Sequence, residues 1–140
     1  MRCCSELVWA DEQLLASHAL DPLQGTRTAP RDMVNLLRLI WTDQAGPAAA
    51  CERVRAVMTQ QLTRHGIASG FRSPVWVAVK SGSLVGVVRN EIGVISHPDG
   101  RRYAAAVLTR SLPGSDDFAI SGAIGTATAL AVTALREGGT

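Results

Sequence analysis

Val75-Trp76-Val77-Ala78-Val79-Lys80-Ser81-Gly82-Ser83 is the stretch that decides the fold of this chain. Its first five residues form the most hydrophobic run in the sequence and are rich in β-branched side chains, which is typical of a strand buried on both faces. Lys80, the only lysine among 14 basic residues, ends that run. Because a desolvated ammonium without a partner is costly, we expect this charge to have a function.

The composition predicts a single globular domain. A chain of 140 residues with 46% hydrophobic content is of ordinary size and polarity for one domain. The net charge is +2 with mixed signs, and only Arg101 and Arg102 are adjacent cations, so there is no basic stripe of the kind that binds nucleic acid. We therefore expect no nucleic-acid partner.

No metal, cofactor or membrane site is predicted. Cys3, Cys4 and Cys51 match no zinc spacing, and the three histidines, at 18, 65 and 97, lie in unrelated contexts typical of structural or solvated side chains. The first residues lack the apolar core of a signal peptide, and we expect no stretch to reach the ~18–20 apolar residues that cross a bilayer. As written, the chain is predicted to be cytoplasmic, which leaves open whether a full-length parent is exported.

Helices are predicted before the hydrophobic run. One is expected from Leu7 to His18, and a stronger signal follows Thr28-Ala29-Pro30, which supplies a cap-type residue and a first-turn proline. The apolar residues after it have helical spacing: Met33, Leu36, Leu37, Ile40 and Trp41. Beyond Gly46-Pro47, a second face comprises Cys51, Val54, Met58 and Leu62, with Gly66 as the expected stop. These two helices should form an antiparallel pair.

Three strands are predicted after the helices. The strand from Val75 to Lys80 leads through a small-residue turn to a second, Val85 to Ser96. That strand ends at His97-Pro98-Asp99-Gly100, a strong hairpin signal because proline presets one dihedral angle and glycine accepts positive φ. Tyr103 to Thr109 should return beside it, so the strands form an antiparallel meander.

A final helix completes the predicted architecture. Ser115 can cap it, and Asp116 and Asp117 in its first turn suit the helix dipole. We predict an α+β fold in which a helix pair, a three-stranded antiparallel sheet and a C-terminal helix packed on the sheet form one partial domain. Its segments are a divergent loop or helix at 1–25, the helix pair at 26–66, the sheet at 74–110 and the terminal helix at 115–136.

Five sequence features in series resemble one enzyme family. They are Thr28-Ala29-Pro30-Arg31-Asp32-Met33, Lys80-Ser81-Gly82-Ser83, Gly86-Val87-Val88-Arg89-Asn90-Glu91-Ile92-Gly93, Pro98-Asp99-Gly100-Arg101-Arg102-Tyr103, and the small-residue terminal helix. Their order and approximate spacing resemble the C-terminal half of a class A β-lactamase or a related β-lactamase-like serine hydrolase. The resemblance extends roughly from Asp21 to Arg136, which is about half of the family's domain.

The resemblance implies a substrate-binding wall. By analogy, Lys80 would supply positive charge to the cleft, and Ser81 would donate its hydroxyl to a substrate carboxylate. Gly82 would leave room for the substrate, and the Ser83 backbone N–H would be one oxyanion-hole donor. Arg89 falls where many class A enzymes have a carboxylate-binding arginine. The implied ligand is a small carboxylate-bearing molecule such as a β-lactam.

The family's other catalytic motifs are absent from these 140 residues. The nucleophile of the family lies in a Ser-x-x-Lys motif, but the residue three places before the only lysine is Val77. No Ser-Asp-Asn occurs, and Ser115-Asp116-Asp117 is better explained as a helix cap. Glu12 is a weak candidate for the general base, since alanine replaces the expected asparagine four residues after it. The chain alone is therefore predicted to be inactive.

Three functional hypotheses follow. The chain can be part of a β-lactamase-like acyl-transfer hydrolase whose nucleophile lies elsewhere, a truncated non-catalytic binding fragment, or a penicillin-binding or D-alanyl peptidase-like module. The first helix motif and the position of Arg89 argue against the third. The resemblance also implies an uncovered strand edge and an exposed helix stripe, so we expect a homodimer, a complementing N-terminal half or poor solubility.

Overall fold

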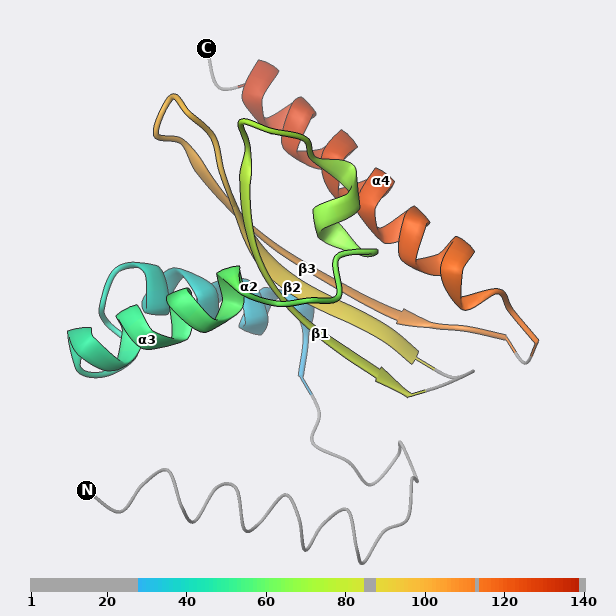
Figure 1. The fold of residues 1–140 in the computed structure, drawn as a ribbon, viewed down its shortest axis with the longest axis horizontal. Coiled ribbons are helices and arrows are strands. Elements are labelled where there is room, and N and C mark those ends of the chain that lie inside the picture. The colour runs from blue at the N-terminus through green and yellow to red at the C-terminus, as the bar shows by residue number, and fades with distance from the viewer. Residues whose placement is uncertain (1–27, 85–87, 113, 139–140) are drawn as a thin grey trace, which may run out of the picture.

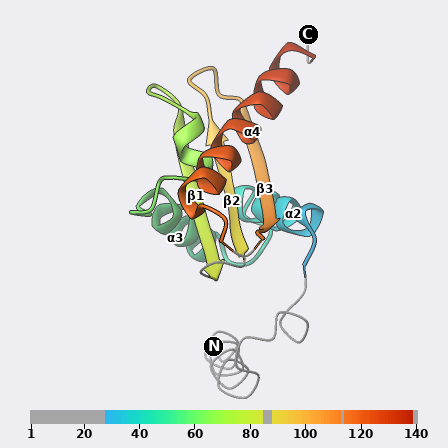
Figure 2. The ribbon, with the colours of Figure 1, turned by 90° about the vertical axis from the view of Figure 1, so that its right-hand side faces the viewer.

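The computed structural model describes residues 28–84, 88–112 and 114–138, and these form three layers (Figures 1 and 2). The central layer is an antiparallel sheet in the order β1-β2-β3, with β1 at Trp76–Leu84, β2 at Val88–Ser96 and β3 at Arg102–Arg110. The helices α2 (Pro30–Trp41) and α3 (Ala48–Thr59) cover one face. The helix α4 (Asp117–Glu137) and the short 3-10 helix η1 (Ile67–Gly70) cover the other. The predicted fold class and meander are confirmed.

Strand alternation divides the apolar residues of the sheet between two cores. Val77 and Val79 of β1 pack with Ile95 of β2 beneath α4 and η1. Ala78 of the same strand packs instead with Leu37 of α2 on the opposite face. The predicted strand buried on both faces is therefore confirmed for 77–79, although Trp76 at its start is 76% exposed.

The two strands of the predicted hairpin pair antiparallel. The His97–Gly100 turn is closed by a hydrogen bond from the Gly100 N–H to the His97 carbonyl at 3.0 Å, and Gly100 has φ +84°. Beyond the turn Ser96 pairs with Arg102, and the ladder continues to Val88 opposite Arg110. The strand β1 pairs with the other side of β2 and places Ser81 opposite Glu91. The turn residues at 97–100 therefore predicted this hairpin correctly.

The helix boundaries differ from the prediction in two places. Helix α3 ends at Thr59, so Leu62 does not extend its apolar face and is 95% exposed, and Gly66 precedes η1 instead of ending α3. The reason is that Gln61 turns toward β1 and hydrogen-bonds it. At α4, Asp116 is the cap in place of Ser115, since its carboxylate accepts the Phe118 N–H at 2.8 Å.

Helix α4 is more apolar than we expected. Its 21 residues have a mean hydropathy of 1.7 over the most apolar window, and only 22% of that window is buried, so by length and composition alone α4 could cross a membrane. The expectation that no stretch is long enough was wrong on this criterion. The inner side of α4 packs on the protein through Ile124 and Val132, whereas Leu130 and Leu135 are exposed. The predicted exposed helix stripe is therefore confirmed.

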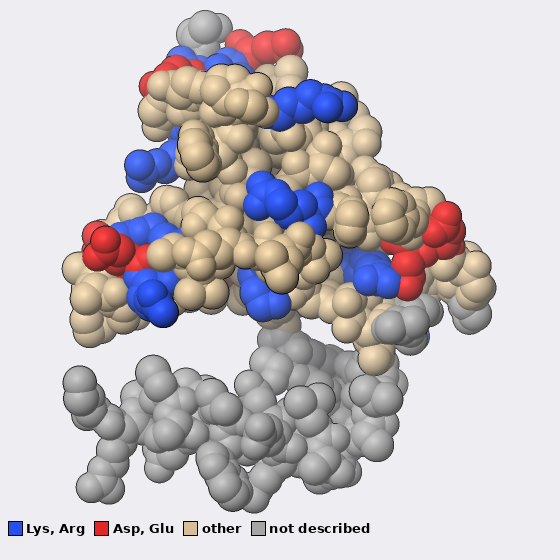
Figure 3. Space-filling model, viewed as in Figure 1, with Lys and Arg blue, Asp and Glu red and all other residues tan. Residues whose placement is uncertain are grey.

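The predicted uncovered strand edge is also present. Among the described residues β3 pairs only with β2, and its other edge lies in an apolar hollow of about 240 Å³ between α2 and α4. The hollow is lined by five consecutive residues of the strand, 103–107, by Val34 of α2 and by small or apolar residues of α4. On the face drawn in Figure 3, charged side chains lie in small separate groups, so no extended surface of one sign marks a ligand site there.

Candidate functional site

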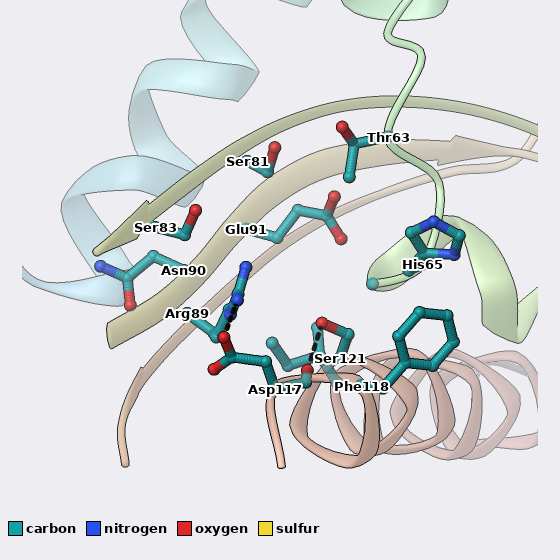
Figure 4. Close-up of a pocket in the computed structure, with 12 residues that line it drawn as sticks. Thr63, His65, Ser81, Ser83, Arg89, Asn90, Glu91, Asp117, Phe118 and Ser121 are labelled. Carbon is teal, nitrogen blue, oxygen red and sulfur yellow. Dashed lines mark hydrogen bonds and ion pairs between the residues drawn. The ribbon is translucent and has the colours of Figure 1, made fainter. Parts of the chain in front are cut away.

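A cavity of about 320 Å³ opens between β1, β2, the start of α4 and the segment that precedes η1. Figure 4 shows polar side chains from all four segments around it. Because residues two apart in a strand share a face, β1 contributes Ser81 and Ser83, and β2 contributes Arg89 and Glu91. The remaining lining residues are Thr63, His65, Gly66, Asn90, Asp117, Phe118, Ser121 and Ile124.

Gln61 holds Ser81 at the free edge of β1, which is the edge that pairs with no other strand among the described residues. The Ser81 N–H donates to Gln61 Oε1 at 3.1 Å, and Gln61 Nε2 donates to Ser81 Oγ at 3.1 Å and to the Thr63 carbonyl at 3.0 Å. These partners decide the orientation of the amide, because one side must accept and the other must donate. The Ser81 oxygen is thus occupied as an acceptor, and its own hydrogen is available for another group.

The same bond shows which way the β1 backbone faces. The Ser81 N–H points away from β2, toward Gln61. Since N–H groups two residues apart in a strand point to the same side, the Ser83 N–H also faces the free edge. No atom lies within 4 Å of the position that a Cβ would occupy at Gly82, so there is open space beside that edge.

Arg89 forms an ion pair with Asp117, the first residue of α4 (Figure 4). The bond joins Arg89 Nη2 to Asp117 Oδ2, and it lowers the pKa of the Asp117 carboxyl below its usual range. Two buried atoms of the pair, Arg89 Nε and Asp117 Oδ1, have no hydrogen-bond partner among the described residues. The guanidinium is therefore at the cavity, but part of its charge is already neutralised.

Glu91 is a buried carboxylate, only 3% exposed, beneath the cavity. Its Oε2 accepts the Ile67 N–H of η1, and its Oε1 lies 3.5 Å from Gln61 Nε2. Burial raises the pKa of Glu91 above its ordinary value, and the Ile67 N–H and the charges of Arg64 and Lys80 oppose that rise. The site thus contains a carboxyl group that is costly to ionise.

Lys80 is exposed and does not line the cavity. It shares the face of Ala78, opposite to that of Ser81, and its Nζ donates to the Ser81 carbonyl oxygen at the free edge. The ammonium is therefore solvated, and no desolvation cost has to be offset. Of the predicted site residues, the structure brings Ser81, Ser83 and Arg89 together around the cavity, with Gly82 and Lys80 beside them on the edge. Glu12 lies outside the described residues.

Several residues of the candidate site were not predicted as such from the sequence, among them Gln61, His65, Glu91 and Asp117. Glu91 had a signal, since it alternates with the inward-facing Gly93 and Ile95 and is a carboxylate among core positions. His65 was expected to be structural or solvated; it is exposed, it lines the cavity, and its ring lies 5.0 Å from that of Phe118. Gln61 could not be predicted as a site residue, because the spacing of apolar residues predicted that helix α3 continues beyond it.

Comparison with known proteins identifies the family. Residues 5–135 match the family model described as the β-lactamase enzyme family. The chain belongs to that family. A curated relative, the β-lactamase regulatory protein BlaB of Streptomyces cacaoi, is 34% identical over 110 residues, which are 69% of this chain and 35% of that protein. This β-lactamase-family chain therefore spans about a third of the curated relative that it matches.

Solved structures agree with the family assignment. A class A β-lactamase from Bacteroides cellulosilyticus superposes with a TM-score of 0.75 and 19% identity, over 90% of this chain and 47% of that one. A PBP-A variant, solved as an acyl-enzyme complex with penicillin G, has a TM-score of 0.71 and 25% identity, over 83% of this chain and 43% of that one. This β-lactamase-family chain is a C-terminal portion of that fold.

Proposed function

We propose that this chain binds a small carboxylate-bearing ligand, such as a β-lactam, along the free edge of β1. In this proposal the Ser81 hydroxyl and Arg89 bind the ligand carboxylate, and the Ser83 N–H donates to a ligand carbonyl. Lys80 supplies positive charge at the edge, and Gly82 leaves room for the ligand. Charge-assisted hydrogen bonds of this kind contribute roughly 1.5–3 kcal/mol each, which is sufficient for recognition.

The bond from Gln61 to Ser81 is the observation that carries the proposal. A serine hydroxyl has one hydrogen to donate, and here its oxygen already accepts from Gln61 Nε2 at 3.1 Å. The hydrogen is therefore available to an acceptor in the cavity, which is also lined by Arg89. One hydroxyl donor beside one guanidinium is an arrangement suited to a carboxylate.

The residues present favour binding of the ligand without acylation. The 140 residues contain no Ser-x-x-Lys, so the Ser83 N–H would act without a nucleophile beside it. Removing the serine of such a catalytic unit costs about a million-fold in turnover. The curated relative is named a regulatory protein, which supports a binding role over hydrolysis.

A second candidate is acyl transfer shared with another polypeptide. It is supported by the uncovered β3 edge and by the extent of the match, since the chain spans under half of the similar structures. In that case the nucleophile comes from the partner, and this chain supplies the ligand-binding wall. The two candidates differ in whether a segment bearing Ser-x-x-Lys restores turnover.

Titration of the 15N-labelled chain with benzylpenicillin tests the first candidate. We expect shifts at the amides of Ser81 and Ser83 and at the Gln61 side chain, with no added mass in intact-mass spectrometry. Ser81→Ala should weaken binding by about ten-fold, the value of one hydrogen bond to a charged group. Ser96→Ala, at the other end of the β1–β2 pair, is the matched control. A covalent adduct, or equal binding by both variants, would overturn the proposal.

A further inference from the structure

Glu91 is a buried ionisable group to which the proposed function gives no role. It lies directly across the β1–β2 ladder from Ser81, at a distance typical of cross-strand neighbours, and its carboxylate points toward the cavity (Figure 4). Its place is closely fitted, since a Cβ added at Gly66 would lie 2.0 Å from Glu91 Oε2. The Ile67 N–H binds the same oxygen. The carboxylate is therefore held at the site by the surrounding backbone.

A ligand carboxylate at this site would meet a like charge. Ser81, Arg89 and Glu91 all line the same cavity, so an anion held by the first two lies close to the third. Arg89 offers only partial compensation, because it is already paired with Asp117. Two negative charges in a partly enclosed site repel strongly, and uptake of a proton by one of them removes the repulsion.

Other charged or titratable groups lie near Glu91 on every element around it. They are Arg64 and His65 from the segment between α3 and η1, Lys80 from β1, Arg89 from β2 and Asp117 from α4. Arg64 and Lys80 favour the ionised form of Glu91, whereas burial is the largest influence and favours the protonated form. His65 also lines the cavity, and imidazole side chains are common proton acceptors in proteins, so the test has to separate the two residues.

We infer that Glu91 is the specificity-determining residue of the Ser81–Arg89 site, and that an anionic ligand binds there together with one proton taken up by the Glu91 carboxyl. This inference rests on the proposed function. The proton comes from solvent, the guanidinium of Arg89 stays charged, and no covalent bond changes. Monoanionic ligands then bind more tightly as the pH falls, dianions bind more weakly than monoanions, and uncharged esters bind without a proton.

Calorimetry of the whole chain with benzylpenicillin at pH 6 to 8, in buffers of different ionisation enthalpy, measures the protons taken up. For the wild type we expect uptake of up to one proton for each ligand bound. For Glu91→Gln, which keeps an acceptor for the Ile67 N–H, we expect no uptake and an affinity at pH 8 at least about ten-fold higher. His65→Gln should still take up the proton.

The methyl ester of benzylpenicillin is a control that needs no substitution, and it should bind the wild type without proton uptake. Uptake that persists in Glu91→Gln, or that disappears in His65→Gln, would assign the proton to another group and overturn the inference. Binding of benzylpenicillin by the wild type without any uptake would also overturn it. Failure of every variant to bind at any pH would instead refute the proposed function itself.

Discussion

The two edges of the sheet differ in chemistry. The edge of β1 is polar: Gln61 satisfies the Ser81 amide, the Lys80 ammonium is solvated, and Gly82 has open space beside it. The edge of β3 lies in an apolar hollow between two helices. A polar edge can exchange water for a ligand at little cost, whereas an apolar edge gains stability only when protein covers it. The β1 edge is therefore suited to binding and the β3 edge to packing.

Gly70→Ala should have the largest effect, because it disturbs the packing of η1, which helps to form the site at the polar β1 edge. A Cβ at Gly70 would lie 2.2 Å from the Gly125 carbonyl oxygen, so α4 and η1 would have to separate. Overpacking of this kind costs roughly 1–3 kcal/mol. We expect the free energy of unfolding, measured with urea, to fall by that amount. The cavity should also change, since η1 supplies the N–H that binds Glu91.

Gly82→Ala is the matched control on the edge itself. With nothing within 4 Å of the new Cβ, the fold should be unchanged or more stable by up to about 1 kcal/mol. Benzylpenicillin should nevertheless bind more weakly, because the methyl group occupies the space beside β1. Equal destabilisation by the two alanines would mean that the β1 edge is packed and not open.

Leu135→Glu tests the other edge. Leu135 lines the hollow beside β3 and is 62% exposed, so the substitution should change stability by less than about 0.5 kcal/mol. We expect it to reduce self-association of the chain markedly, as measured by sedimentation velocity. Leu62→Glu, at an exposed position away from that hollow, should leave association as it is in the wild type. A wild-type chain that is monomeric and soluble would contradict the expected role of this edge.

Glu91→Gln should change how stability depends on pH. Burial raises the pKa of Glu91 in the folded state above its unfolded value, so folding favours the protonated form. The associated stabilisation is present below the unfolded pKa and is lost as the pH rises through the folded pKa. The variant should therefore melt at a higher temperature than the wild type at pH 8, and the difference should shrink on acidification to pH 4.

Asp117→Asn should have the smallest effect, a modest rise in affinity for benzylpenicillin. The substitution keeps a hydrogen-bond acceptor for Arg89 but removes the negative charge that neutralises it. Titration of both proteins at 20 mM and 200 mM salt should show a larger salt dependence in the variant. An affinity that falls would indicate that the ion pair positions the guanidinium for the ligand.

Regular periodicity explains what could be predicted from the sequence. Strand β1 was found from its run of β-branched residues, and the hairpin from Pro98-Asp99-Gly100, because these patterns act over a few neighbouring residues. The end of α3 was missed, since the apolar spacing continues to Leu62 while Gln61 bonds to a strand 20 residues later. A long-range hydrogen bond of one side chain leaves no periodic signal.

The residues of the candidate site also divide into those that a local motif predicts and those that only the tertiary fold brings together. Ser81, Gly82 and Arg89 were predicted as site residues because they lie in motifs that resemble a known family. Gln61 and Asp117 contact them from segments that only the tertiary fold brings near. Glu91 could have been found as a carboxylate in an inward-facing strand position, since such residues are rarely buried without a specific environment.

Lys80 gives the chain an unusual practical property. It is the only lysine, and its exposed amine lies beside Ser81 on the edge where the ligand is proposed to bind. Amine-reactive dyes would therefore label one side chain. A fluorophore attached there would report occupancy of the edge directly, and protection of the amine from labelling would allow compounds to be screened without a catalytic assay.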